Sequence, residues 1–453
     1  MKTAMKNNII RVLIYVCVLI SFIIKMNFYS DHFGYFNDEL AHVSYVAYLE
    51  ANDEIYPEFR NMTLLSNCDL NGKESTCTFN ETLNWLGHPP LYYEVMRLMG
   101  GVSCDGDVIT VDMHQLRTNT HILACIALGL AFFIGYKKIK RIVPTLVYAV
   151  MLVSVPMFSV VSAGLNNDTM SYICVLIYAL GIMRFSEGKR DFGTYTLIAA
   201  GITMSGLTKL TTLIIIVVSA LIVVGVTIFK EKSAKCIFNK KFIISLVFYI
   251  PVIIYYIMML KNYGSVQFTA TKYGYPAVFV PEDQRGIHGI FHYFIEYVNM
   301  YLITWCNVSS HYTVVKTQYL LSVENIGLMI MVVSPFVLFL FNRKNKNKLL
   351  FNSVFIGYVI TMAINFVTCY SAYTSRGYFG GMHSRYYYCL LPVFSLWLCS
   401  IYGKTKKFLT NKLETYFSEK SISIGVDVAL LVFASLLVYG DFLVFLKINT
   451  MYI

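Results

Sequence analysis

The sequence predicts an all-α integral membrane protein with about eleven transmembrane helices, because its apolar residues gather in segments of roughly 17 to 25, the length that crosses a bilayer core. Of its 453 residues, 57% are hydrophobic and only 14% are charged, a balance that a water-soluble globule does not have. Aromatic residues make up 15% of the chain and suit a protein with many membrane interfaces. Lipid is therefore the expected solvent for most of the chain.

The predicted spans follow one another along the whole chain, so residues 1 to 453 are expected to form a single polytopic membrane domain. The connection between the fifth and sixth spans, residues 205 to 209, is short enough for a tight helical hairpin. Two connections are long, residues 30 to 114 and 261 to 322. The spans are predicted at residues 9 to 29, 115 to 136, 142 to 163, 168 to 184, 192 to 206, 208 to 229, 242 to 260, 323 to 341, 349 to 370, 384 to 401 and 424 to 446.

The positions of the basic residues predict the orientation of the chain. Of the 37 Lys and Arg residues, 24 fall in the N-terminal tail and in every second connection. Short basic connections stay in the cytoplasm, so the N-terminus is expected there and both long connections on the extracytoplasmic side. The net charge of +11 is thus a topology signal, and no nucleic-acid partner is expected.

The densest polar motif follows the first span and consists of Asn37, Asp38, Glu39 and, three residues later, His42. The apolar and aromatic residues 43 to 49 predict a short interfacial helix along the membrane surface. If the helix begins near Asp38, then Asp38, Glu39 and His42 lie on neighbouring faces. The alternative is structural, with Asp38 as an N-cap and Glu39 as a first-turn acid that complements the helix dipole.

A second motif, Gly87-His88-Pro89-Pro90, lies later in the same connection and is followed by Leu91 and Tyr92. Paired prolines fix the first turn of a helix, where their missing N–H groups cost nothing. Residues 91 to 99 are therefore expected to form a second interfacial helix. The alternative is a turn that packs the connection against the membrane domain, with His88 as a packed histidine.

Polar residues also mark the outer ends of several spans. Charges at membrane depth are expensive and usually functional, although snorkelling at span ends is the structural alternative. Lys209 and Arg385 oppose the positive-inside trend, and an Arg side chain offers a planar fork that matches phosphate oxygens. The residues of this group are Asn166, Asn167, Asp168, Lys209, Arg376, His383 and Arg385.

Most of the eleven cysteines fall within predicted spans, but Cys68, Cys77 and Cys104 lie in the first long connection. In an oxidising compartment a bridge between Cys68 and Cys77 is one of two open outcomes, the other being free thiols.

Taken in order, these motifs together with Leu207-Thr208-Lys209 and the segment 384 to 392 resemble a bacterial family of multi-spanning membrane proteins. That family is similar to the GT-C superfamily, which includes protein O-mannosyltransferases and lipid A aminoarabinose transferases. The resemblance covers most of the chain. It implies a GT-C-like helical fold with a cavity at the outer membrane face, a polyprenyl-phosphate sugar donor and a bacterial plasma membrane location. The acceptor class, whether glycan, lipid or protein, stays open.

The resemblance also implies roles for particular residues in an inverting displacement. Asp38 matches the loop acid that acts as catalytic base, with Glu39 beside it. The basic residues Lys209, Arg376 and Arg385 are expected to stabilise charge on the departing lipid phosphate. No cofactor is firmly implied, although His42 and His88 are alternatives for binding a divalent cation. The remaining predicted substrate-binding residues are Tyr92, Asn167, Asp168 and His383.

Two other functions fit a chain with many spans. A transporter or flippase of a lipid-linked or polar solute is expected to place polar residues at the bilayer midplane, often in broken helices. In this sequence the polar clusters lie at the outer interface and the span centres are largely apolar. A polymerase or ligase of lipid-linked glycans shares the outer face and the arginines, and its product distinguishes it.

Overall fold

The computed structural model describes residues 2–32, 36–72, 74–106, 108–273, 289–308, 322–341 and 347–451. Within these ranges nine helices are long and apolar enough to cross a membrane, or ten if one bent pair is counted as a span. The prediction of a predominantly α-helical, multi-pass membrane protein is thus confirmed, with fewer candidate spans than the eleven expected.

Seven candidate spans are single helices, and two are built from consecutive short elements because the local helix geometry changes within them. The single helices are α1 (Lys2–His32), α4 (Met113–Lys138), α7 (Asp168–Ser186), α9 (Leu210–Glu231), α13 (Val323–Phe341), α14 (Lys348–Arg376) and α17 (Glu419–Met451). The composite spans are α10 (Lys240–Ser245) with η2 (Leu246–Tyr249) and α11 (Ile250–Tyr263), and η5 (Ser384–Leu390) with α15 (Leu391–Ser400) and α16 (Tyr402–Leu413).

The other two predicted spans differ from single straight helices. Residues 142 to 163 form α5 (Ile142–Val153) and α6 (Pro156–Ala163), which meet at an angle of 58°. Pro156 begins α6, where its ring and missing N–H interrupt the helix. The fifth predicted span is α8 (Phe192–Gly206), whose 15 residues extend only about 22 Å at 1.5 Å per residue.

The second long connection contains a helix that the sequence does not predict. Helix α12 (Ile290–Cys306) has 17 residues and packs against α13, α14 and η5. Its Tyr293, Tyr297 and Tyr301 recur every four residues and are all buried, so one face of α12 joins the protein core. Residues 274 to 288 and 309 to 321 of this connection lie outside the described residues.

The first long connection contains both predicted helices, α2 (Glu39–Asn52) and α3 (Leu91–Met99), the second beginning directly after Pro90. It also holds an antiparallel sheet, in the order β1-β2-β4-β3, that the sequence analysis did not predict. Residues 41 to 49 of α2 are all buried, because α3 and the strands cover the helix. The strands are β1 (Thr63–Ser66), β2 (Ser75–Leu83), β3 (Val102–Asp105) and β4 (Val108–Val111). Two short 3-10 helices complete the described elements, η1 (Ala234–Cys236) and η3 (Ala270–Tyr273).

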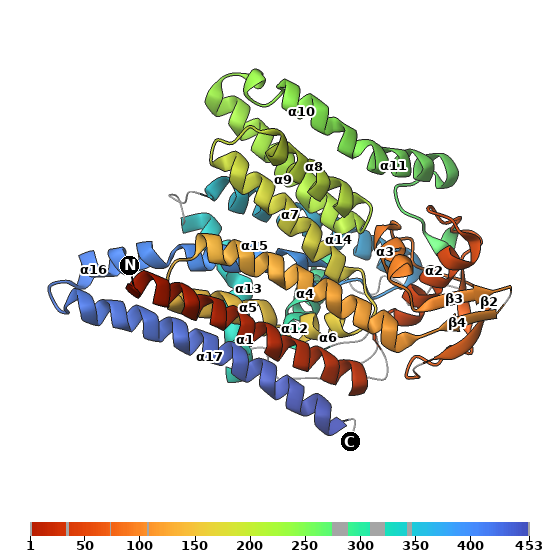
Figure 1. Cartoon of the computed structure of the whole chain (residues 1–453), viewed down its shortest axis with the longest axis horizontal. Coiled ribbons are helices and arrows are strands. Elements are labelled where there is room, and N and C mark those ends of the chain that lie inside the picture. Colours follow the sequence, from red (N-terminus) through yellow and green to blue (C-terminus); the bar gives the residue numbers. More distant parts are fainter. Residues whose placement is uncertain are drawn as a thin grey trace.

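The two ends of the molecule differ in character (Figure 1). The sheet lies with α2 and α3 at one end of the helical body, whereas α16 and the N-terminus lie at the opposite end. Helix α16 carries Lys404, Lys406, Lys407 and Lys412. The N-terminus and the basic helix α16 therefore lie at the end of the helical body opposite to the first long connection.

Candidate functional site

Asp38 occupies the N-cap position of α2, but its side chain does not cap the helix. No side-chain hydrogen bond to the first turn is formed, and the backbone has a left-handed φ of 62°, which residues other than glycine rarely adopt. The carboxylate Oδ2 instead accepts a hydrogen bond from Arg385 Nη2 at 2.7 Å. The side chains of Asp38 and Arg385 are 14% and 5% exposed, so this is a largely buried ion pair.

Arg385 lies in η5 and retains unused hydrogen-bonding capacity. Its Nε and Nη1 are buried and have no hydrogen-bond partner among the described residues. The guanidinium borders a cavity of about 10 Å³, the room that one water molecule occupies, together with Phe36, Asn37 and Asn166. Buried charged donors without partners are costly, because each has lost its hydration without compensation. Arg385 can therefore gain energy from one further hydrogen-bond acceptor.

A second buried ion pair lies beside the first. Lys209, at the N-cap of α9, binds Oδ1 of Asp168, the first residue of α7. The other oxygen of Asp168, Oδ2, is buried without a partner in the described part of the chain. The ring of Tyr386 connects the pairs, since its centroid lies 4.8 Å from Lys209 Nζ and 5.5 Å from Arg385 Cζ. Both cations thus lie within cation–π distance of one aromatic ring.

His42 and His88 are buried next to these charges. Their rings are nearly parallel at 6.3 Å, and His42 Nδ1 lies 2.9 Å from the Tyr93 hydroxyl. Burial lowers the pKa of His42 to about 3; the nearby Asp38 carboxylate opposes this shift, and Arg385 and Lys209 add to it. Burial, followed by Lys209, lowers the pKa of His88 as well. Both imidazoles are therefore neutral at pH 7.

Glu39 points into a separate cluster and is fully buried. Arg117 of α4 donates to both of its oxygens, from Nε at 3.1 Å and from Nη2 at 2.7 Å, and the backbone N–H of Leu165 donates to Oε1 at 3.0 Å. Arg117 also donates to the carbonyls of Ser30 and Leu70. The pair therefore joins α1, α2, α4 and the first connection, a geometry that does not favour the catalytic role expected for Glu39.

Four predicted site residues remain, and they differ in how close they lie to the two ion pairs. Tyr92 is buried with its hydroxyl 3.3 Å from Thr120 Oγ1, and Asn167 Nδ2 donates to the Thr208 carbonyl beside Lys209. His383 is buried, and its ring lies 6.5 Å from that of Tyr386. Arg376, at the end of α14, donates instead to Thr271 Oγ1 at 2.6 Å. No described contact joins Arg376 to Asp38 or Arg385.

No family model matches the sequence, and no curated protein matches it. Among solved structures, ArnT from Cupriavidus metallidurans in the apo state is 12% identical with a TM-score of 0.49, and ArnT bound to undecaprenyl phosphate is 12% identical with a TM-score of 0.47. Each alignment covers 97% of this chain and 76% of that protein.

The structure adds Arg117, Tyr93 and Tyr386 to the residues that the sequence singled out. Arg117 carries the same signal as Lys209, a basic residue at the outer end of a predicted span, and could have been found by it. Tyr93 and Tyr386 stand in motifs already recognised, but aromatic residues are too frequent in this chain to be distinctive. Among the described residues, no group of three or more His, Cys, Asp or Glu side chains is arranged to hold a metal ion.

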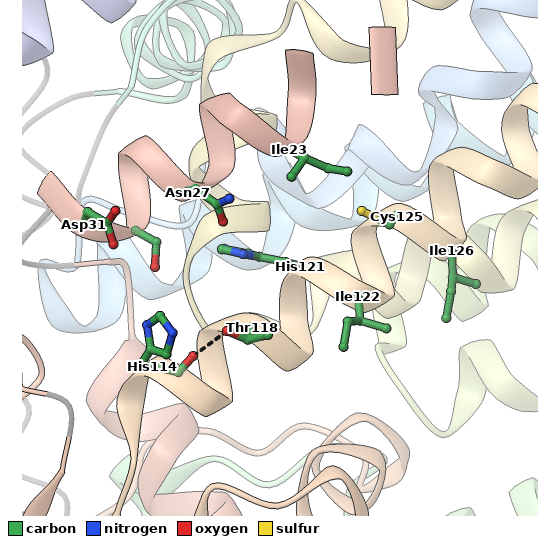
Figure 2. Close-up of a pocket in the computed structure, with 10 residues that line it drawn as sticks. Ile23, Asn27, Asp31, His114, Thr118, His121, Ile122, Cys125 and Ile126 are labelled. Carbon is green, nitrogen blue, oxygen red and sulfur yellow. Dashed lines mark hydrogen bonds between the residues drawn. The ribbon is translucent and has the colours of Figure 1, made fainter. Parts of the chain in front are cut away.

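A larger pocket of about 760 Å³ lies between α1 and α4, outside the ion-pair cluster (Figure 2). Its polar end is lined by Asn27, Asp31, His114 and Thr118, and its apolar end by residues such as Ile122. Neither Asp38 nor Arg385 lines it. The candidate site is thus a closed cluster of mutually neutralising charges and is distinct from this open pocket.

Proposed function

We propose that the protein is a GT-C-type membrane glycosyltransferase, which moves a sugar from a polyprenyl-phosphate donor to an extracytoplasmic acceptor with inversion. The observation that supports this proposal most directly is the contact between Asp38 and Arg385, which lies next to Lys209. Asp38 is a candidate base, and Arg385 is a cation with two unused hydrogen-bond donors. The order of the motifs along the sequence supports the same reaction class.

In the proposed displacement an acceptor hydroxyl attacks the anomeric carbon while the bond from that carbon to the phosphate oxygen breaks. Asp38 takes the hydroxyl proton, and the polyprenyl phosphate leaves with the bonding electrons. Arg385, through its Nε and Nη1, and Lys209 stabilise the charge that collects on the phosphate. One proton moves to the enzyme, so atoms and charge balance.

The ion pair gives a reason why donor binding precedes catalysis. A carboxylate held by a guanidinium is a weak base, because protonation would break the pair. A phosphate that binds Nε and Nη1 of Arg385 partly neutralises the guanidinium charge and so weakens the attraction between Nη2 and Asp38. Donor binding thereby prepares the base, and the buried Arg385 donors acquire partners.

Glu39 then acts as a positioning residue and not as a second catalytic acid. Its oxygens are occupied by Arg117 and by the Leu165 backbone, while Asp38 is its direct neighbour in the chain. Fixing Glu39 fixes the first turn of α2 and with it the backbone of Asp38. The neutral imidazoles of His42 and His88 lie beside the two ion pairs. They can accept hydrogen bonds from a sugar hydroxyl or donate hydrogen bonds to it.

The test compares wild-type protein with Asp38→Asn in lipid nanodiscs, supplied with labelled polyprenyl-phosphate sugars and an extracted acceptor pool. The matched control is Asp105→Asn, which changes an exposed aspartate of the same connection. We expect transfer to be lost in Asp38→Asn, with donor binding retained, and unchanged in Asp105→Asn. Equal transfer by all three proteins would remove Asp38 from the mechanism.

The same assay separates the alternatives. A product that grows by repeat units identifies a polymerase, whereas movement of an intact labelled lipid across sealed vesicles without transfer identifies a flippase. If the protein does not bind the donor, it is not the proposed transferase. The same holds if it transports the lipid and Asp38→Asn leaves that transport unchanged.

A further inference from the structure

Two cysteines of the first long connection lie close together at the edge shared by β1 and β2: Cys77 is in β2, and Cys68 follows the end of β1 by two residues. The ladder pairs Ser66 of β1 with Thr78 of β2, and the following residue, Asn67, has a left-handed φ of 59° that turns the chain after the strand. The hydroxyl of Ser75 lies 3.8 Å from the sulfur of Cys68 and 3.5 Å from the sulfur of Cys77. Both sulfur atoms therefore contact the Ser75 hydroxyl oxygen.

The proximity is also seen in the electrostatics of Cys68. Burial, followed by the neighbouring Cys77 thiol, raises the pKa of Cys68 to about 12. A thiol with such a pKa is a poor nucleophile in the folded sheet, because the thiolate is the reactive form. Any bond between the two sulfurs is therefore expected to form while the connection is still folding.

The third cysteine of the connection is excluded as a partner for Cys77. Ile109 of β4 pairs with Cys77 on one side and with Cys104 on the other, so a whole strand separates the two cysteines. Two strand spacings amount to about 9.6 Å, beyond the separation of roughly 7 Å that a disulfide bridges. Cys104 is thus a control within the same sheet.

The segment between Cys68 and Cys77 contacts the structure that supports the candidate site. The Leu70 carbonyl accepts a hydrogen bond from Arg117 Nη2 at 2.9 Å, and the same nitrogen binds Glu39 at 2.7 Å. Glu39 precedes the rest of α2 and follows Asp38. A restraint on this segment therefore also restrains the Leu70 carbonyl, which is one of the hydrogen-bond acceptors that hold Arg117 in place.

We propose that Cys68 and Cys77 are oxidised to a structural disulfide that closes the segment 69 to 76 and holds its Leu70 carbonyl against Arg117. The proposal rests on the extracytoplasmic placement of the first connection, which is part of the proposed function. The disulfide can be measured without any sugar donor or acceptor, so this proposal can be tested separately from the proposed transfer reaction.

The oxidant is a disulfide-carrying thiol oxidoreductase, the class that acts in oxidising compartments. One cysteine thiolate attacks the carrier disulfide, whose S–S bond breaks to give a mixed disulfide and one carrier thiol. The second cysteine thiolate then attacks the mixed disulfide and releases the other carrier thiol. The two cysteines lose two protons and two electrons, and the carrier is reduced to its dithiol.

The first experiment purifies the full chain without reductant and blocks free thiols with a maleimide under denaturing conditions, before and after reduction. Peptide mass spectrometry is expected to show Cys68 and Cys77 linked, and blocked only after reduction, whereas Cys104 is blocked beforehand. Free Cys68 and Cys77 would overturn the proposal. In that case Cys104 is tested on intact cells with a membrane-impermeant maleimide. If Cys104 is labelled, the first connection is extracytoplasmic and only the disulfide proposal is wrong. If Cys104 is protected, the extracytoplasmic placement is wrong as well.

A second measurement addresses the structural consequence. Reductant is expected to lower the thermal midpoint of the wild type and of Cys104→Ser by about 3 °C, the order expected for a short closed loop in a chain of 453 residues. The double variant Cys68→Ser, Cys77→Ser is expected to show no response to reductant. An equal response in the double variant would assign the effect to other cysteines.

Discussion

Arg385 and Asp38 meet at 2.7 Å although 347 residues separate them in the chain. One belongs to η5 near the C-terminal end and the other to the first long connection, so the pair forms only when both ends of the protein have packed together. The contact joins a candidate base to a candidate phosphate-binding group.

Substitutions of Arg385 are expected to weaken donor binding in a graded way. Arg385→Lys keeps the charge but loses the planar fork, and we expect the affinity for polyprenyl phosphate to fall about tenfold; Arg385→Gln should lower it at least about 100-fold. The measurement is titration of the lipid into protein in nanodiscs. Arg376→Gln is the comparison, because the described contacts of Arg376 lie outside the cluster, and its affinity is expected to stay unchanged. An equal loss in Arg376→Gln would place Arg376 in the site, as the sequence predicted.

Removing one partner of the pair between Glu39 and Arg117 is expected to destabilise the fold. Glu39→Ala leaves a buried guanidinium without its carboxylate and should lower the free energy of unfolding by about 3 to 5 kcal/mol. Replacing both residues by Leu should cost less than the two single changes together. Unfolding in micelles, followed by tryptophan fluorescence, measures these differences. The exposed Glu81→Gln serves as the control, and unchanged stability of Glu39→Ala with lost transfer would instead support a catalytic Glu39.

Acid is expected to destabilise the protein through its buried histidines. The pKa of His42 is about 3 in the folded protein, below the unfolded value near 6.5, so the unfolded chain binds more protons between these values. The stabilising contribution is therefore complete above about pH 6.5 and is lost as the pH falls toward 3, by up to about 1.4 kcal/mol per pH unit. Thermal unfolding near pH 7.5, 6 and 5 measures it. His42→Gln should flatten the dependence, whereas the exposed His32→Gln should not; equal slopes for all three proteins would contradict the assignment.

Gly87 is expected to tolerate no side chain. A Cβ atom there would lie 2.3 Å from the Phe268 carbonyl oxygen, so Gly87→Ala must displace the segment that carries His88. We expect a stability loss of about 1 to 3 kcal/mol and transfer reduced at least tenfold, measured by thermal unfolding and by the nanodisc assay. Gly129→Ala in α4 is the control, because its added Cβ meets no atom within 4 Å among the described residues, apart from its own stretch of helix. Loss of function in both variants would point to general sensitivity to alanine.

The sequence by itself determined the membrane class and most of the helices, because partition into lipid depends on the composition of each segment and hardly on its neighbours in space. It also located α3 after its paired prolines and brought Asp38, His42, His88, Asp168, Lys209 and Arg385 to notice. Helix α12 and the small sheet were not predicted, since a Tyr-rich helix carries a weak local signal and three of the four strands have only four residues.

Only the tertiary structure decided which charges bind each other. Nothing in the local sequence distinguishes Asp38 from Glu39, yet Asp38 binds Arg385 and Glu39 binds Arg117, 78 residues away. Likewise, Arg376 and Arg385 look equivalent as outer-face cations, and packing places only Arg385 beside the carboxylate. Ion pairing depends on distances between side chains from different helices, and these distances exist only after the helices have assembled.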